Sequence, residues 1–294
     1  RAVDANGSLV YPDFVETVIR ILPLFLFRAL GGVLFLGGFV LMLYNVCKTI
    51  KQAPKELEEE TVQVKISSSA PVHQERGHRK LEGMAAAFTI LALIAILVGS
   101  IIEIVPTLSV NKYVNTENKV EPFTPLELEG RDIYVKEGCF TCHSQMIRTI
   151  PSDVLRYGAA STIEESMYDR PFQWGSKRTG PDLARLGKKY PDLWHYMHME
   201  DPRAVIKESI MPAYPWLITS TIDFDSLEKK VAVSNKLGVP YSDEDLSDTS
   251  ERAKEQAKKI ADVLKKQGVK EDVSDKQITA LIAYLQALGQ KGAE

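Results

Sequence analysis

Residues 139–143 are Cys-Phe-Thr-Cys-His, and this pentapeptide indicates which fold the surrounding domain has. The pattern C-x-x-C-H is the attachment signature of a c-type haem. Two thiols at this spacing reach the two vinyl groups on one edge of the porphyrin, and the histidine that follows turns under the ring to bind iron. We therefore expect one haem c, held covalently by Cys139 and Cys142, with His143 as an iron ligand.

Two other kinds of site use paired cysteines, and the sequence disfavours both. A thioredoxin-like dithiol requires a preceding strand in a βαβ unit, and no such pattern precedes residue 139. A zinc site requires two further cysteines or histidines at paired spacing, and the one remaining cysteine is Cys47, in a distant apolar segment. Three cysteines are also too few for a disulfide scaffold.

The second axial ligand is expected from the segment 209–216, Ser-Ile-Met-Pro-Ala-Tyr-Pro-Trp. We expect Met211 to bind the iron, because the proline after it presents the side chain from a stiff extended segment. His195 and His198 are the imidazole alternatives. Three further methionines are expected only to fill space: Met167, Met197 and Met199. Two aromatic residues of the segment are expected to line the haem: Tyr214 and Trp216. Methionine–histidine ligation leaves no open coordination site and suits electron transfer.

Two apolar runs indicate a membrane protein. Residues 29–47 and 84–102 carry no formal charge, and each run of 19 residues would be about 28 Å long as a helix, near the thickness of a bilayer core. We expect a first membrane helix at 21–47 and a second at 82–106, ending at Pro106. Two spans disfavour a polytopic transporter, and a net charge of −3 gives no sign of nucleic-acid binding.

The charge distribution predicts the topology. Seven Lys or Arg residues lie in 48–83, against two in 1–20, so the positive-inside rule places the joint between the helices in the cytoplasm. The domain that carries the pentapeptide then lies on the periplasmic side. The expected segments are a membrane helix in 1–47, a cytoplasmic linker at 48–81, an anchor helix at 82–106 and a periplasmic monohaem domain at 107–294.

The periplasmic domain is expected to be mainly α-helical. Apolar residues recur at helical spacing near 133, near 204 and along 278–289, which ends at a glycine. One stripe of that last segment is expected to face the core: Ile278, Leu281, Ile282, Leu285 and Leu288. The stretch 222–272, rich in Asp, Glu, Lys and Ser, is expected to be a peripheral, mobile excursion.

Three long motifs resemble one family. They are ELEGRDIYVKEGCFTCHSQMIR (127–148), YDRPFQWGSKRTGPDLARLG (168–187) and SIMPAYPWL (209–217), and they resemble the membrane-anchored monohaem subunit of cbb3-type cytochrome c oxidases, the FixO or CcoO type. Residues 1–50 resemble instead the last membrane helix of the catalytic FixN or CcoN subunit. Because the chain also begins with Arg1 rather than Met, we expect a FixO-type subunit fused behind a longer catalytic subunit.

The resemblance implies a haem-copper oxidase of the bacterial inner membrane that reduces oxygen to water and pumps protons. This chain would only carry electrons, because the ligands of the catalytic haems and copper would belong to the preceding part. The implied partners are the catalytic subunit, a dihaem FixP or CcoP-type subunit and small assembly subunits. The implied fold is a class I cytochrome c, in which a helix near 126–137 crosses one near 275–289, with Gly130 and Tyr134 facing Leu281 and Leu285.

The same resemblance implies contacts to the haem edge. The segment WGSKRTGPDL (174–183) would face the haem of the catalytic subunit, and the backbone of Ser176 would bind a calcium ion there. Arg148, Lys177 and Arg178 are candidate partners of the haem propionates, with ordinary surface cations as the alternative.

Two other functions remain open on the sequence. The monohaem anchor subunit of a nitric oxide reductase also has one membrane helix and one haem c. A membrane-bound thiol or metal module without haem is the alternative from another class.

Overall fold

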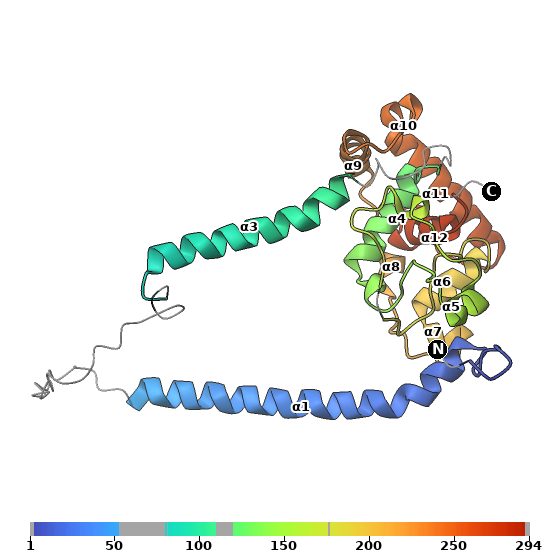
Figure 1. The fold of residues 1–294 in the computed structure, drawn as a ribbon. Coiled ribbons are helices and arrows are strands. Elements are labelled where there is room, and N and C mark those ends of the chain that lie inside the picture. Colours follow the sequence, from blue (N-terminus) through green and yellow to red (C-terminus); the bar gives the residue numbers. More distant parts are fainter. Residues whose placement is uncertain (1–2, 53–79, 81, 110–119, 176, 292–294) are drawn as a thin grey trace, which may run out of the picture. The chain divides into compact units, whose positions relative to one another are not determined.

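The computed structural model describes residues 3–52, 80, 82–109, 120–175 and 177–291. Within them the chain is helical, with two isolated β-bridges and no sheet. The elements are α1 (Phe14–Gln52), α3 (Ala85–Ser109), α4 (Pro125–Lys136), η2 (Cys139–Thr141), α5 (Pro151–Tyr157), η3 (Glu164–Ser166), α6 (Asp192–Glu200), α7 (Pro202–Val205), α8 (Trp216–Thr219), α9 (Phe224–Lys236), α10 (Asp243–Ser247), α11 (Thr249–Lys266) and α12 (Gln277–Ala287) (Figure 1).

The chain divides into two compact units. A globular unit contains residues 1–22 and 114–294, and the second unit contains residues 23–113. The first 22 residues therefore group with the domain that carries the haem motif, whereas the sequence placed them with the first membrane segment alone. The expected linker at 48–81 lies largely outside the described residues.

Two helices are long and apolar enough to cross a membrane, α1 and the Ala85–Pro106 part of α3. Both extend beyond their expected ends. Helix α1 begins at Phe14 rather than near 21, where the side chain of Asp13 accepts a hydrogen bond from Val15 N at 3.1 Å and caps the first turn. Helix α3 continues through Pro106 to Ser109.

The core of the globular unit is the crossing of α4 and α12. A Cβ on Gly130 of α4 would lie 2.0 Å from the carbonyl O of Ala280 and 2.7 Å from Cβ of Tyr284. Only glycine permits this approach. The sequence predicted the two helices and the glycine correctly, but Gly130 meets Ala280 and Tyr284 rather than Leu281 and Leu285.

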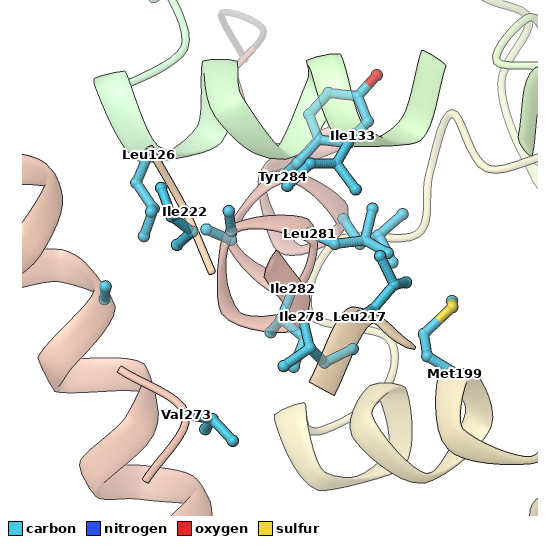
Figure 2. Packing of buried hydrophobic residues seen from close by; sticks show 14 of the residues in the cluster. Leu126, Ile133, Met199, Leu217, Ile222, Val273, Ile278, Leu281, Ile282 and Tyr284 are labelled. Atoms are coloured by element: carbon cyan, nitrogen blue, oxygen red, sulfur yellow. The ribbon is translucent and has the colours of Figure 1, made fainter. Parts of the chain in front are cut away.

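Helix α12 is buried on nearly every side. The expected stripe is in the core, with each member at most 6% exposed. Figure 2 shows Leu126 and Ile133 of α4 on one side of α12, with Leu217 and Met199 on the other. The opposite face of the helix, including Ala280 and Tyr284, is also buried. This helix therefore lies inside the unit instead of on its surface. It ends as expected, with Gly289 at φ +74°.

The stretch 222–272 is a folded part of the core, which corrects the expectation of a mobile excursion. It forms α9, α10 and α11. Leu227 and Val231 of α9 are fully buried. Helix α11 buries a stripe at spacings of four and three residues: Ala253, Ala257, Ala261 and Leu264. Helix α11 packs against α4 and α12, and α9 packs against α4 and α11. Small alanines at i, i+4 spacing form an apolar face that overall composition conceals.

We expect Gly130→Ala to lower the free energy of unfolding by about 3 kcal/mol, because the new methyl overlaps main-chain atoms that cannot move without separating the two helices. Urea unfolding of the detergent-solubilised chain, followed by circular dichroism, measures the change. Lys136→Ala, at an exposed side chain of the same helix, is the control and should change stability by less than about 0.5 kcal/mol. Equal effects of the two substitutions would contradict the role of the close approach.

Candidate haem site

Four predicted ligands converge on one cavity of the globular unit. Cys139, Cys142, His143 and Met211 all line a cavity of about 350 Å³, within the range of roughly 300–1,000 Å³ that is typical of cofactor pockets. Met211 is distant from the pentapeptide in sequence, so the fold alone brings them together. The cavity is bounded on another side by Leu281 and Leu285 of α12, together with residues from several other elements.

The two thiols are presented by a tight turn after α4. Gly138 takes a left-handed conformation at φ +73° and starts the single 3₁₀ turn η2. The amide of His143 donates to the carbonyl of Cys139 at 2.9 Å, which winds the two cysteines and the histidine onto one side of the turn. Both thiols are free. Burial, together with the nearby carboxylate of Glu137, raises the pKa of Cys139 to about 12, so this thiol is protonated at neutral pH.

The His143 ring is fixed with one nitrogen free for a metal. Its Nδ1 lies 2.7 Å from the carbonyl O of Pro181. A carbonyl only accepts, so Nδ1 carries the proton and Nε2 keeps its lone pair. Burial lowers the pKa of His143, which keeps the ring neutral. A Cβ on Gly180 would lie 2.2 Å from Cε1 of this ring, so the backbone of Gly180 forms the surface against which the imidazole rests.

The segment WGSKRTGPDL is packed onto the pentapeptide of its own chain. The amides of Thr179 and Gly180 both donate to the carbonyl of Cys142 at 3.0 Å, and the amide of Leu183 donates to Ser144 O at 2.9 Å. The amides of Thr179, Gly180 and Leu183 are therefore engaged within the chain, and the contact of this segment with a partner's haem stays a prediction. Their hydrogen bonds hold the haem-attachment turn in place.

Arg178 is an internal cation rather than an exposed one. Its side chain is only 7% exposed and forms ion pairs with Asp153 and Asp182 at 2.9 Å. It also donates to the Ser144 hydroxyl and the Met146 carbonyl. Arg148 pairs with the same Asp153 oxygen at 2.9 Å. Neither arginine lines the cavity, so the structure does not place them as the expected propionate partners.

This network fixes the charge of Asp153. Burial alone would raise its pKa, but hydrogen bonds from Arg178 and Arg148 outweigh burial and hold the pKa at about 2. The carboxylate is therefore ionised at all physiological pH values. It joins the start of α5 to the loop that follows the haem motif, and this link restrains the loop.

Two tyrosines of the core donate hydrogen bonds to the loop that contains His143 and Gln145. The hydroxyl of Tyr134, on α4, donates to the carbonyl of His143 at 2.9 Å. The hydroxyl of Tyr284, on α12, donates to the side-chain carbonyl of Gln145 at 2.9 Å. Burial raises the pKa of both tyrosines, so both remain donors. The α4–α12 crossing thus reaches the haem turn through two hydrogen bonds.

Met211 lies in an irregular segment of the chain. The helix expected near 204 is one turn only, α7, and the chain from 206 to 215 is non-helical. Arg203 Nη1 donates to the Met211 carbonyl at 3.2 Å, and Met211 N donates to the Ser209 hydroxyl at 3.2 Å. Tyr214 lines the cavity as expected. Trp216 does not, because it is 44% exposed and its indole donates to Glu137 at 3.0 Å.

Two histidines of α6 also line the cavity. His195 is only 1% exposed, and neither ring nitrogen has a partner in the protein. His198 stacks on Trp194 with ring centroids 4.5 Å apart, and its Nδ1 is also unpartnered. Burial lowers the pKa of each to about 4, so both are neutral. Met199 is the second methionine on the lining, and these three residues are the alternatives to Met211 as iron ligand.

Sequence reasoning missed several residues of the wall. The cations that line the cavity are Arg156 and Lys189, and residues 12–15 and 18 form part of its surface. No local motif marks them, since they come from separate segments. Ser176 lies outside the described residues, and Lys177 is exposed. In the described part of the chain, no group of three or more His, Cys, Asp or Glu side chains is arranged to hold a separate metal ion.

The residues present fit a haem. Two free thiols at attachment spacing, a histidine with an available Nε2 and a methionine surround one cavity, as a six-coordinate haem c requires. Apolar side chains supply most of the remaining wall. The one N–H of the neutral, unpartnered His195 ring and the buried, unpartnered Nε of Arg156 are donors that match the polar edge of such a group.

The fold and this site define a membrane-anchored haem protein. The chain belongs to the FixO family, described as cytochrome c oxidase, mono-heme subunit, whose family model matches residues 78–291. This membership places it among the haem-containing, electron-transport subunits of cbb3-type cytochrome c oxidases, and it favours an oxidase over a nitric oxide reductase.

The chain also resembles part of another oxidase subunit. It is 48% identical over 50 residues to the cytochrome c oxidase subunit 1 homolog of Agrobacterium tumefaciens (strain T37), which is 17% of this chain and 9% of that protein. It is 49% identical over 53 residues to the homolog of Azorhizobium caulinodans, or 18% and 9%. It is 44% identical over 55 residues to cytochrome c oxidase subunit 1 of Rhodobacter capsulatus, or 19% and 10%. The chain spans about a tenth of the length of these curated relatives.

We expect Arg178→Gln to lower the free energy of unfolding by about 3 kcal/mol at pH 7, because it leaves two buried carboxylates short of a partner. The pKa of Asp153 is lowered in the folded state, so its contribution of about 2 kcal/mol is complete above pH 4 and is lost as pH falls through about 2. The difference between the wild type and the variant should therefore shrink below pH 4. Urea unfolding at several pH values measures it.

The matched control is Arg252→Gln, which removes an exposed arginine that pairs with Glu244 and Asp245 and should change stability by less than about 1 kcal/mol. A stability difference for Arg178→Gln that stays constant from pH 7 to pH 2 would contradict the ionised Asp153.

We expect Gly180→Ala to displace the imidazole of His143, because the added Cβ would lie 2.2 Å from Cε1. The haem should remain attached through the thiols while a large fraction of the iron becomes high-spin. Optical and electron paramagnetic resonance spectra measure the change. Gly158→Ala is the control: its added methyl meets nothing within 4 Å although φ is +102°, so it adds backbone strain without a clash and should keep the low-spin spectrum.

Proposed function

We propose that this chain is the electron-transfer subunit of a proton-pumping haem-copper oxidase that reduces oxygen to water. It passes single electrons from one covalent haem c to the catalytic subunit. The observation that carries the proposal is the convergence of Cys139, Cys142, His143 and Met211 on one cavity. Membership of the FixO family supports the assignment to an oxidase.

The protein side of the chemistry follows from these residues. Each thiol S–H adds across one vinyl C=C to give a thioether, so attachment needs no oxidant and releases nothing. When bound, the haem supplies a one-electron couple. His143 and Met211 would bind the iron and would leave no site for oxygen on this subunit. Methionine as a ligand would favour the reduced iron and raise the potential.

The haem domain is proposed to lie on the periplasmic side of the bacterial inner membrane, with the joint between α1 and α3 in the cytoplasm. This orientation follows from the excess of Lys and Arg in that joint, and c-type haems are attached on the outer side.

The proposed partners are a catalytic subunit fused upstream, a dihaem FixP-type subunit and small assembly subunits. The likeness to oxidase subunit 1 proteins supports the fusion. A calcium ion at the interface, bound through Ser176, is proposed from the family resemblance alone.

Met211→Ala tests the axial ligand. We expect the haem to remain attached, because attachment needs only the thiols, while the iron becomes high-spin or takes a weak replacement ligand. Optical spectra of the full chain should then lose the methionine–iron charge-transfer band. Met197→Ala, at a core methionine off the cavity lining, is the control and should keep that band. An unchanged low-spin spectrum in Met211→Ala would transfer the ligand role to Met199, His195 or His198.

Two measurements separate the competing functions. A pyridine haemochrome spectrum of the purified chain should show one haem c, and its absence would point to a thiol or metal module instead. The intact complex should consume oxygen with reduced cytochrome c as donor. Turnover of nitric oxide without oxygen consumption would overturn the oxidase assignment.

A further inference from the structure

We propose that the chain segment 11–18, at the start of membrane helix α1, is a wall of the haem site and is fastened there by Arg156. The proposal rests on the haem function proposed above and adds a part of the site that belongs to the first membrane helix. The geometry involves only residues of the globular unit.

The segment lines the same cavity as the haem ligands. Pro12, Asp13, Phe14, Val15 and Val18 contribute to its surface. Val18 is only 6% exposed, whereas the next residue, Ile19, is 48% exposed. One face of the first turns of α1 is therefore buried against the globular unit. Val18 is the buried residue of α1, and the residues after 25 in this helix are exposed, so this contact is specific to its N-terminal end.

Arg156 of α5 holds the segment by two contacts. Its Nη2 donates to the carbonyl of Tyr11 at 2.6 Å. Its guanidinium carbon lies 5.8 Å from the centroid of the Phe14 ring, within the range of a cation–π interaction. The hydrogen bond joins residues that are 145 positions apart in the chain. Together the two contacts hold the start of α1 beside α5, and the exposed part of α1 takes no part in them.

The Nε donor of Arg156 indicates what the wall is for. Its Nε is buried and has no partner in the protein, yet Arg156 lines the cavity. A buried guanidinium donor without a partner is costly, and a carboxylate is the group it fits best. The carboxylate of Asp13 is engaged by Val15 N at the cap of α1. The haem propionates supply the matching chemistry.

The wall has a measurable consequence for the haem. Apolar groups that exclude water from a haem, and a cation beside its propionates, both disfavour the more positive ferric state and so raise the reduction potential. Removing the apolar side chains or the cation should therefore lower the reduction potential. A residue that served only to stabilise the fold would lower the unfolding free energy without this shift.

The test uses the full chain with its haem attached and compares potentials by spectroelectrochemical titration. Phe14→Ala/Val18→Ala should reduce the equilibrium constant for reduction about tenfold, which is about 59 mV for a one-electron couple. Arg156→Gln should also lower the reduction potential. Arg156→Lys, which keeps the charge, should have a potential close to that of the wild type. Hydrogen exchange should show faster exchange of amides 14–18 in Arg156→Gln.

Ile19→Ala, beside Val18 but exposed, and Arg252→Gln, on the surface of α11, are the matched controls and should keep the wild-type potential. Haem attachment in every variant with unchanged potentials and unchanged exchange at residues 14–18 would overturn the wall while leaving the proposed function intact. Absence of haem c from the wild-type chain would overturn the proposed function itself.

Discussion

The approach of α4 to α12 at Gly130 is the constraint on which the haem site depends. Because a Cβ there would overlap the main chain of Ala280, the two helices pack backbone to backbone. That separation places the rings of Tyr134 and Tyr284 with centroids 5.5 Å apart and directs both hydroxyls to the loop that carries His143 and Gln145. A wider crossing would move both hydroxyls away from that loop, so packing in the core sets the position of a ligand at its edge.

The sequence was sufficient wherever chemistry requires a fixed local pattern. Two cysteines separated by two residues must reach one porphyrin edge, so the pentapeptide predicted that Cys139, Cys142 and His143 line one cavity, as they do. The two apolar runs predicted two helices of spanning length for the same reason, since the bilayer fixes that length. The ends of those helices were less well predicted, because α1 begins with a capped polar turn at Asp13 and α3 continues past a proline. Hydropathy records neither effect.

Charged residues were harder to place from sequence. A basic segment has the same composition whether its cations face solvent or buried carboxylates. Of the two partners of Arg178, Asp182 is close to it in the sequence and Asp153 is distant in the sequence. Only the fold decides between them. The same applies to residues 222–272, where many charges suggested mobility. Helix α11 has low mean hydropathy because charged residues surround its buried alanines, although those alanines and Leu264 form an apolar face.

The contact between Arg156 and Tyr11 has an evolutionary consequence. Everything between these residues, including both apolar helices and the joint that connects them, forms one closed loop of chain. Lengthening such a loop is thermodynamically mild, about 0.6 kcal/mol for each doubling. Insertions and deletions in the joint are therefore nearly neutral for this contact, while exchanges at Tyr11, Phe14, Val18 and Arg156 are not. Among related fused chains, the joint should vary freely in length, and the four contact positions should change together.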